Sequence, residues 1–251
     1  MIKLSERLQI IADRIEPAET MADIGTDHGF LPVFLRESGR CSKVIMTDIS
    51  FPSLEKARAN ASRCSAQVQK GIEFRAGDGL HVISPGEVNA VVIAGMGGKL
   101  IRDIMSSDMD ITCSVNKFVL QPRIGQGHLR RWLCMNGFII TNEDLVTEGD
   151  YIPEIITALT PDELSSYADD MYKGYEERMM AASGDDIIWK IPPWIIRASG
   201  PVEQFLIRNI NKEKKKLENV MLAKTRKLEL EEKIKCDIKY LESLVEELNN
   251  G

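Results

Sequence analysis

The stretch Ala22-Asp23-Ile24-Gly25-Thr26-Asp27-His28-Gly29 has the spacing of a nucleotide-binding loop that joins a strand to a helix. In the usual pattern, an acidic residue is followed by glycines two, four and six positions later. Asp23, Gly25 and Gly29 keep this spacing, whereas Asp27 occupies the middle glycine position. Because a glycine there lets the backbone approach a ligand closely, Asp27 is expected to bring a carboxylate to the ligand itself. The stretch therefore predicts a ligand site and a reactive group in one loop.

Strands and helices alternate outward from this loop. Short apolar runs predict strands at 20–24, 43–47, 71–76, 90–94 and 117–121, and a closing hairpin at 138–146 and 154–159. Helices are expected at 4–15, 31–37, 51–61 and 128–135. This alternation, finished by a hairpin, predicts an α/β fold with a mainly parallel, doubly wound sheet.

Four of the predicted strands end in residues suited to binding a ligand. After the loop at Asp23, the second strand ends at Asp48, the third at Gly77-Asp78-Gly79 and the fourth at Gly95-Met96-Gly97-Gly98. Each of these could be an ordinary turn or a helix cap. Ligands of doubly wound sheets, however, bind at the carboxyl ends of strands, and Asp48 lies where a ribose-binding carboxylate is expected. Their joint placement therefore favours a single cofactor site.

Length and composition exclude several classes of protein. No apolar run of the 251 residues approaches the roughly 20 needed to span a bilayer, and residues 1–7 lack the apolar core of a signal peptide. We therefore expect a cytoplasmic protein without a membrane partner. The five cysteines form no Cys-x-x-Cys pair, and there are only three histidines. These features predict reduced packing cysteines and no metal.

Charge is distributed unevenly along the chain. The net charge is −6, yet residues 197–240 contain 12 Lys or Arg against 7 Asp or Glu. Two apolar stripes at helical spacing run through this region, out of register with one another around 224–230. They predict two helices folded back as an antiparallel coiled coil. On charge alone, a solvated helical face is the better explanation of the basic residues.

The loop favours S-adenosylmethionine over a dinucleotide as the cofactor, because the Gly-x-Gly-x-x-Gly pattern of dinucleotide-binding loops is absent. In addition, Asp23, two positions before Gly25, suits the amino acid end of S-adenosylmethionine. Hydride transfer is therefore the weaker alternative. The predicted cofactor-binding residues lie after the first four strands. They are Asp23, Gly25, His28 and Gly29, then Asp48 and Ile49, then Asp78 and Gly79, and finally Ala94, Gly95 and Met96.

Five motifs together resemble the bacterial tRNA adenine-22 N1-methyltransferase family. They are Leu4-Ser5-Glu6-Arg7-Leu8, residues 22–32, Gly77-Asp78-Gly79-Leu80, Ile93-Ala94-Gly95-Met96-Gly97-Gly98 and Leu120-Gln121-Pro122. The resemblance covers about the first 160 residues and implies a Rossmann-like class I methyltransferase domain followed by a helical coiled-coil domain. It also implies S-adenosylmethionine as donor, tRNA as acceptor and Asp27 as the residue nearest catalysis. Arg123 departs from the family's pattern at the position after Gln121-Pro122.

The residues after the fourth strand agree with a ring nitrogen as the methyl acceptor. Enzymes that methylate the exocyclic amine of adenine typically carry an Asn/Asp-Pro-Pro-aromatic motif at this position, and this chain has Ala94-Gly95-Met96-Gly97-Gly98 instead. Adenine N1 already has an in-plane lone pair, so no strong base is required. Asp27 is therefore predicted to orient the target adenine and to stabilise the positive charge that the ring acquires.

With the resemblance, we interpret the basic helical region as an arm that binds tRNA phosphates. The expected organisation is a cofactor-binding domain at 1–160, and a solvated connector plus arm at 161–251 with a monomer favoured. The predicted RNA-binding residues are Lys212, Lys214, Lys215, Lys216, Lys224, Arg226 and Lys227. Candidate platforms for an unstacked base are Phe30, Phe51, Tyr151, Trp189 and Trp194, although packing in the core or at a hinge explains each of them better. A small-molecule methyltransferase, one acting on another RNA and a non-catalytic RNA-binding protein remain alternatives.

Overall fold

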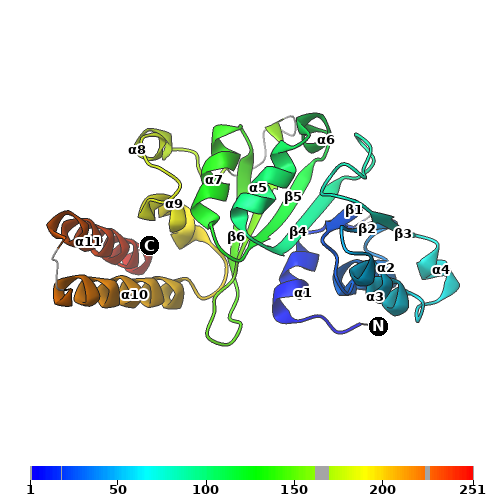
Figure 1. The fold of residues 1–251 in the computed structure, drawn as a ribbon, viewed down its shortest axis with the longest axis horizontal. Helices are drawn as coiled ribbons and strands as arrows, with labels where there is room; N and C mark the ends of the chain where they lie inside the picture. The colour runs from blue at the N-terminus through cyan, green and yellow to red at the C-terminus, as the bar shows by residue number, and fades with distance from the viewer. Residues whose placement is uncertain (1, 18, 162–169, 224–226, 251) are drawn as a thin grey trace.

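The computed structural model describes residues 2–17, 19–161, 170–223 and 227–250. Its centre is a seven-stranded sheet in the order β3-β2-β1-β4-β5-β7-β6, in which β7 alone runs antiparallel to its neighbours (Figure 1). The strands are β1 (Thr20–Ile24), β2 (Lys43–Asp48), β3 (Ile72–Ala76), β4 (Ala90–Met96), β5 (Lys117–Pro122), β6 (Ile139–Leu145) and β7 (Glu154–Leu159). The predicted mainly parallel, doubly wound sheet is confirmed.

Helices cover both faces of the sheet, each over its own apolar core. On one face, Ile11, Leu35 and Ala57 pack with Met46 and Val92. The helices of this face are α1 (Glu6–Asp13), α2 (Phe30–Glu37) and α3 (Phe51–Ala61), with the short α4 (Ala66–Gln69) beside them. The opposite face is covered by α5 (Gly98–Ser106), α6 (Met109–Cys113) and α7 (Gln126–Met135). Residues 90–93 of β4 are fully buried, because this central strand is covered on both faces.

The carboxyl ends of the parallel strands all meet at one edge of the sheet. Strand order reverses between β1 and β4, which lie side by side at the centre. Because β7 is antiparallel to β5, the turn between β6 and β7 lies at this same edge. The predicted strand-end residues are therefore brought together around the switch point of the fold.

After β7 the chain packs three short elements against the sheet before it enters the arm. These elements are α8 (Glu176–Met180), α9 (Ile187–Lys190) and the 3₁₀ helix η2 (Pro193–Arg197). The segment after η2 is pinned to β6, where Leu145 N donates to Ser199 O at 2.8 Å. The arm consists of α10 (Val202–Leu222) and α11 (Leu228–Asn250), which pack along one another (Figure 1).

In the described part of residues 161–187, charged residues such as Lys173 and Glu177 are exposed, as expected of a solvated connector, but the expectation is wrong for three large apolar side chains. Met171, Tyr172 and Met179 are at most 8% exposed and join the core beneath α7. Acidic composition suggested solvent, but these few large apolar side chains decide the packing. Trp189 and Trp194 are fully buried in the same core, so they are excluded as platforms for an RNA base.

A buried ionic network links the sheet to the base of the arm. Arg130 on α7 is fully buried and pairs with Glu143 of β6 and Glu154 of β7. Trp194 Nε1 also donates to Glu143 Oε1 at 2.7 Å, and Arg130 Nη1 donates to Lys190 O at 2.9 Å. Since a buried charge is stable only when it is paired, these bonds specify how α9 and η2 dock on the sheet.

Candidate cofactor and RNA site

Asp23 lies at the end of β1 with its carboxylate turned into the protein. It is 7% exposed, and Thr26 Oγ1 donates to Asp23 Oδ2 at 2.7 Å. Burial raises the pKa of Asp23 to about 6, against the opposing hydrogen bond from Thr26. At neutral pH the site thus presents a largely ionised carboxylate in a poorly solvated position, which favours a cationic group of a ligand.

The two glycines of the loop have different structural tasks. Gly25 has φ +74°, and a Cβ there would lie 2.2 Å from Met96 Cε, so the Met96 side chain covers the loop closely. Gly29 has φ +67° and immediately precedes α2, where a Cβ would lie 2.9 Å from Met46 Sδ. Both positions require glycine for backbone conformation and for space.

Asp27 is the one non-glycine residue with positive φ in the described chain, at +44°. Its side chain is 59% exposed, and its carboxylate lies 3.6 Å from both His28 Nε2 and Lys56 Nζ. His28 in turn stacks on Phe30, with ring centroids 5.3 Å apart. The loop therefore holds Asp27 in an unusual conformation and directs its carboxylate toward solvent, away from the buried Asp23.

Asp48 organises the end of β2 through backbone hydrogen bonds. Its two carboxylate oxygens accept from Ser50 N at 2.8 Å and from Asp27 N at 3.3 Å. Ile49 follows with a side chain that is 76% exposed, an unusual state for an isoleucine in a folded protein. The pair supplies a carboxylate beside an exposed apolar surface, which suits a ribose joined to a flat base.

The ends of β3 and β4 complete this edge. Asp78 is exposed, and Gly79 has φ +55° with its backbone buried against Ile104. Gly95 has φ +79°, and a Cβ there would meet nothing within 4 Å, so open space adjoins the backbone. Ala94 and Met96 flank Gly95 at an irregularity in the pairing of β4 with β5. The strand ends thus form an open cradle of backbone, carboxylates and small apolar surface.

The predicted RNA-binding residues lie on the arm, apart from the strand ends. Lys214 Nζ pairs with Glu242 at 2.9 Å, and Lys216 pairs with Glu213, so two of these charges already have acidic neighbours. Lys212 and Lys215 are exposed on α10, and Lys227 is exposed just before α11. Lys224 and Arg226 lie outside the described residues.

Glu154, at the start of β7, is buried among charged groups. Burial raises the pKa of Glu154, and the charges of Arg130 and, more weakly, Lys212 oppose this rise.

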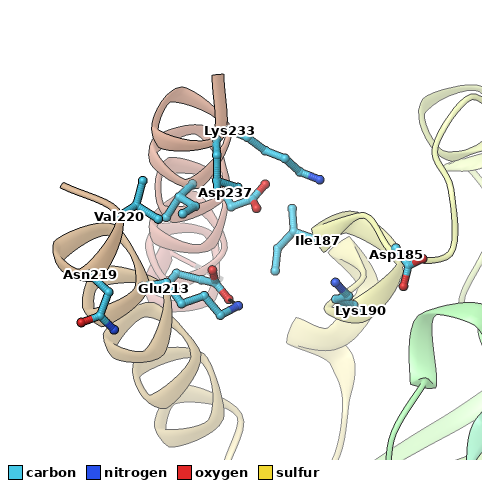
Figure 2. Close-up of a pocket in the computed structure, with 11 residues that line it drawn as sticks. Asp185, Ile187, Lys190, Glu213, Asn219, Val220, Lys233 and Asp237 are labelled. Carbon is cyan, nitrogen blue, oxygen red and sulfur yellow. Dashed lines mark hydrogen bonds and ion pairs between the residues drawn. The ribbon is translucent and has the colours of Figure 1, made fainter. Parts of the chain in front are cut away.

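A separate groove of about 420 Å³ lies between α9 and the two arm helices. Figure 2 shows Lys190 and Lys233 facing it together with Glu213 and Asp237. Positive and negative side chains alternate around it, and Lys233 is paired with Asp186 at 3.1 Å. The groove provides neither the glycines nor the open backbone of the strand ends, so it is not the cofactor site.

Sequence reasoning missed several contacts at the strand ends. Thr26, Lys56 and Glu148 were not singled out, and Arg7 was noted only as part of a motif. Arg7 Nη1 donates to Gln121 Oε1 at 3.1 Å across 114 positions of sequence. No local pattern signals such a contact. Arg123 is exposed and its backbone N donates to Met96 O at 2.8 Å.

Within the described residues, no cluster of three or more His, Cys, Asp or Glu side chains could hold a metal ion. None of the helices in that same part of the chain has the length and apolar character to cross a membrane.

The strand order, the antiparallel β7 and the strand-end cradle define a Rossmann-like methyltransferase fold. A family model described as a methyltransferase domain matches residues 4–156. The Bacillus subtilis (strain 168) tRNA (adenine(22)-N(1))-methyltransferase is 34% identical over 166 residues, which are 66% of this chain and 69% of that protein. The chain belongs to this family of tRNA methyltransferases.

Two solved structures extend the likeness to the arm. The crystal structure of the B. subtilis m1A22 tRNA methyltransferase TrmK superposes with a TM-score of 0.72 at 28% identity, covering 100% of this chain and 99% of that one. A Streptococcus pneumoniae putative tRNA (m1A22) methyltransferase in complex with S-adenosyl-L-methionine gives 0.73 at 23% identity, covering 97% of this chain and 100% of that one. The second likeness concerns the fold alone.

Proposed function

We propose that this protein transfers the methyl group of S-adenosylmethionine to N1 of adenine 22 in tRNA. The observation that carries the proposal is the loop after β1, which buries the Asp23 carboxylate and exposes that of Asp27 four residues later. One loop thus offers a carboxylate to each side of a reaction. Membership of the family supports tRNA as the substrate, and a tRNA substrate in turn supports a cytoplasmic enzyme.

Four strand ends would hold the donor. Asp23, with Gly25 and Gly29 around it, would bind the amino group of the methionine part, and His28 would border it from the same loop. Asp48 would accept hydrogen bonds from the ribose hydroxyls, with Ile49 against one face of the adenine. Asp78 would accept from the adenine amino group beside Gly79. The backbone of Ala94, Gly95 and Met96 would border the reactive end of the donor. These residues fit the group because the cradle is lined by carboxylates and unhindered backbone.

The bound donor supplies a methyl group on a positively charged sulfur. The lone pair of adenine N1 forms the new C–N bond as the C–S bond breaks, and the electron pair of that bond stays on sulfur. The ring thereby becomes positively charged. Because no proton has to leave N1, the protein contributes mainly by placing N1 in line with the methyl group, which is worth up to about 7–11 kcal/mol.

Asp27 is the residue we assign to the acceptor. Its carboxylate is exposed at the strand-end edge and can hold the N6 amino group or face the cationic ring. An ion pair at 4 Å is worth about 4 kcal/mol gross at an effective dielectric constant of 20. Lys56 and His28 lie beside this carboxylate and would keep it oriented before the base arrives.

The arm would hold the tRNA body. We assign methyl transfer to residues 1–160 and RNA binding to residues 161–251, in which α10 and α11 act as an antiparallel coiled coil. Lys212 and Lys215 are its leading phosphate contacts. Lys214, Lys216 and Lys227 add positive charge. Lys224 and Arg226, which lie outside the described residues, are assigned the same role from the sequence. The chain is proposed to act as a monomer, since one copy contains both the donor cradle and the arm.

The test is methylation of an unmodified tRNA transcript by the purified protein with radiolabelled S-adenosylmethionine. N1-methyladenosine is expected at position 22, and a transcript with guanosine at that position is expected to remain unlabelled. Equal labelling of both transcripts would mean that another nucleotide is the target. Labelling of a metabolite pool in place of tRNA would support a small-molecule methyltransferase.

A further inference from the structure

Arg7 on α1 joins three segments at the site edge. Its Nη1 donates to Gln121 Oε1 of β5 at 3.1 Å, and its Nε lies 3.3 Å from a carboxylate oxygen of Glu148 in the turn between β6 and β7. The side chain is 24% exposed. The proposed function gives this residue no role, although it stands in the motif at 4–8.

The same Gln121 side chain also forms a hydrogen bond with the backbone of Gly95. Gly95 N donates to Gln121 Oε1 at 3.1 Å, so a single oxygen accepts from both Gly95 and Arg7. The pairing of β4 with β5 shifts register between Ala94 and Met96, which interrupts the regular ladder at Gly95. The buried Gln121 side chain supplies the acceptor that the ladder lacks, and Arg7 determines where that acceptor lies.

The position of this irregularity affects both sides of the cradle. Gly95 borders the open space of the site, while the neighbouring Met96 covers Gly25 in the loop that carries Asp27. A shift of β4 at Gly95 would therefore have two effects. It would move the backbone that borders the proposed methyl-transfer site, and it would move the Met96 side chain that packs on the loop. Misplacement of reacting groups by about 1 Å can cost 100-fold in rate.

We propose that Arg7 is a positioning residue for methyl transfer, which acts through Gln121 on Gly95 and Met96 while Glu148 orients its guanidinium. An arginine suits this task because its planar fork donates in two directions at once, whereas a lysine offers a compact point charge. The inference rests on the proposed function and adds a residue that touches neither donor nor acceptor.

The kinetic experiment compares Arg7→Gln and Arg7→Lys with the full-length wild type. Arg7→Gln is expected to lower kcat at least tenfold while the KM values for S-adenosylmethionine and tRNA stay within about threefold. Arg7→Lys should fall between the two. The matched control is Arg14→Gln, which breaks the pair between Arg14, the residue directly after the same helix, and Asp144 of β6. It should lower Tm without changing kcat.

A double-mutant cycle tests the route of the effect. If Arg7 acts through Gln121, Arg7→Gln combined with Gln121→Ala should be no slower than Gln121→Ala alone. If the loss of kcat in the double variant were instead the product of the losses in the two single variants, the proposal would be contradicted. An increase in the tRNA KM with unchanged kcat would also overturn it, because Arg7 would then be an RNA contact.

Amide hydrogen exchange provides a readout independent of methylation. In Arg7→Gln the Gly95 amide should exchange at least tenfold faster than in the wild type, and unchanged exchange would contradict the link. If that variant does not fold, Glu148→Gln should give a smaller increase in the same exchange rate, and no increase would count against the link. If the wild type methylates no tRNA, the proposed function is refuted. The exchange rate of the Gly95 amide would still test the link between Arg7 and Gly95.

Discussion

Asp27 combines a positive φ with an exposed carboxylate at the edge of the sheet where the strand-end residues meet. Aspartate and asparagine tolerate positive φ better than other residues with side chains. Asp27, with φ +44°, lies in the middle of the loop between β1 and α2. Its neighbours Lys56 and His28 are exposed as well, so the local charges are open to an incoming substrate. Such strain at a ligand-binding edge points to function.

Asp27→Asn is the clean test of this residue, because asparagine keeps the shape and tolerates the backbone conformation. We expect kcat for tRNA methylation to fall by about 100-fold or more, as when one preorganised electrostatic group is removed from an active site. Affinity for S-adenosylmethionine, measured by calorimetry, should change by less than about threefold. A variant that retains more than half of the wild-type turnover would remove Asp27 from the mechanism.

The raised pKa of Asp23 leads us to expect that binding of S-adenosylmethionine depends on pH. Its pKa is raised to about 6 by burial, so the carboxylate gains a proton as the pH falls through that value. Because the ionised carboxylate attracts the protonated amino group of the donor, affinity should be highest near pH 7 and should weaken below pH 6, where Asp23 gains a proton. It should also weaken above about pH 8, where an α-amino group loses its proton. The slope should approach tenfold per pH unit.

The control for this pH profile is Asp23→Asn, because the amide oxygen of the new side chain can still accept the hydrogen bond from Thr26. The affinity of this variant for the donor should be low and nearly independent of pH between 5 and 8. If the variant shows the same pH profile as the wild type, another group is responsible for the titration.

At the scale of elements, α2 depends on glycines at both of its ends. Gly29 precedes the helix and Gly39 follows it, with φ values of +67° and +71°. A Cβ at Gly29 would lie 2.9 Å from Met46 Sδ, whereas one at Gly39 would meet nothing within 4 Å. The two positions therefore separate backbone strain from steric crowding.

Gly39→Ala should cost about 1 kcal/mol in free energy of unfolding, from backbone conformation alone. Gly29→Ala adds a clash with β2 and should cost about 2–3 kcal/mol. Urea denaturation measures both. Donor affinity should fall only in Gly29→Ala, and equal losses of affinity in the two variants would show that the loop is not the donor site.

The elements that were predicted from sequence are those with strong local signals. The loop glycines, the fully apolar run of β4 and the two apolar stripes of the arm located their elements to within a few residues. The helices α5 and α6 between β4 and β5 were not assigned, and neither were α4, α8 and α9. Four of these, α4, α6, α8 and α9, are at most five residues long and are held by tertiary packing, which sequence periodicity does not report.

The strand-end residues were brought together as expected, because parallel strands necessarily end at one edge. Their proposed roles remain predictions. The contacts around Arg7, Gln121 and Glu148 could not be anticipated, since they join positions more than 100 residues apart through side-chain geometry. The burial of Met171 and Trp189 was likewise decided by the surface left open beneath α7.

At the scale of the whole molecule, an acidic protein must hold a polyanion through a local excess of positive charge. The arm provides this excess, but Lys214 and Lys216 are partly neutralised by Glu242 and Glu213. The better candidates are Lys212 and Lys215, which are exposed on α10.

Lys212→Glu combined with Lys215→Glu should weaken tRNA binding and reduce the slope of log K against log salt by about 1.5–2, since two phosphate contacts are lost. Filter binding between 50 and 200 mM salt measures this slope. The control is Arg63→Glu with Lys70→Glu, which changes net charge equally at exposed positions near α3 and α4. An equal loss in the control would mean that total charge, and not the arm, governs binding.

The most direct measurement is primer extension on a tRNA transcript after reaction with S-adenosylmethionine, because a methyl group on adenine N1 blocks base pairing and stops the polymerase. The wild type is predicted to give a stop at adenine 22. Asp27→Asn, with its donor affinity intact, is predicted to give almost none under the same conditions. A stop at another nucleotide, or an undiminished stop with Asp27→Asn, would contradict the assignment of the loop after β1 to donor and acceptor together.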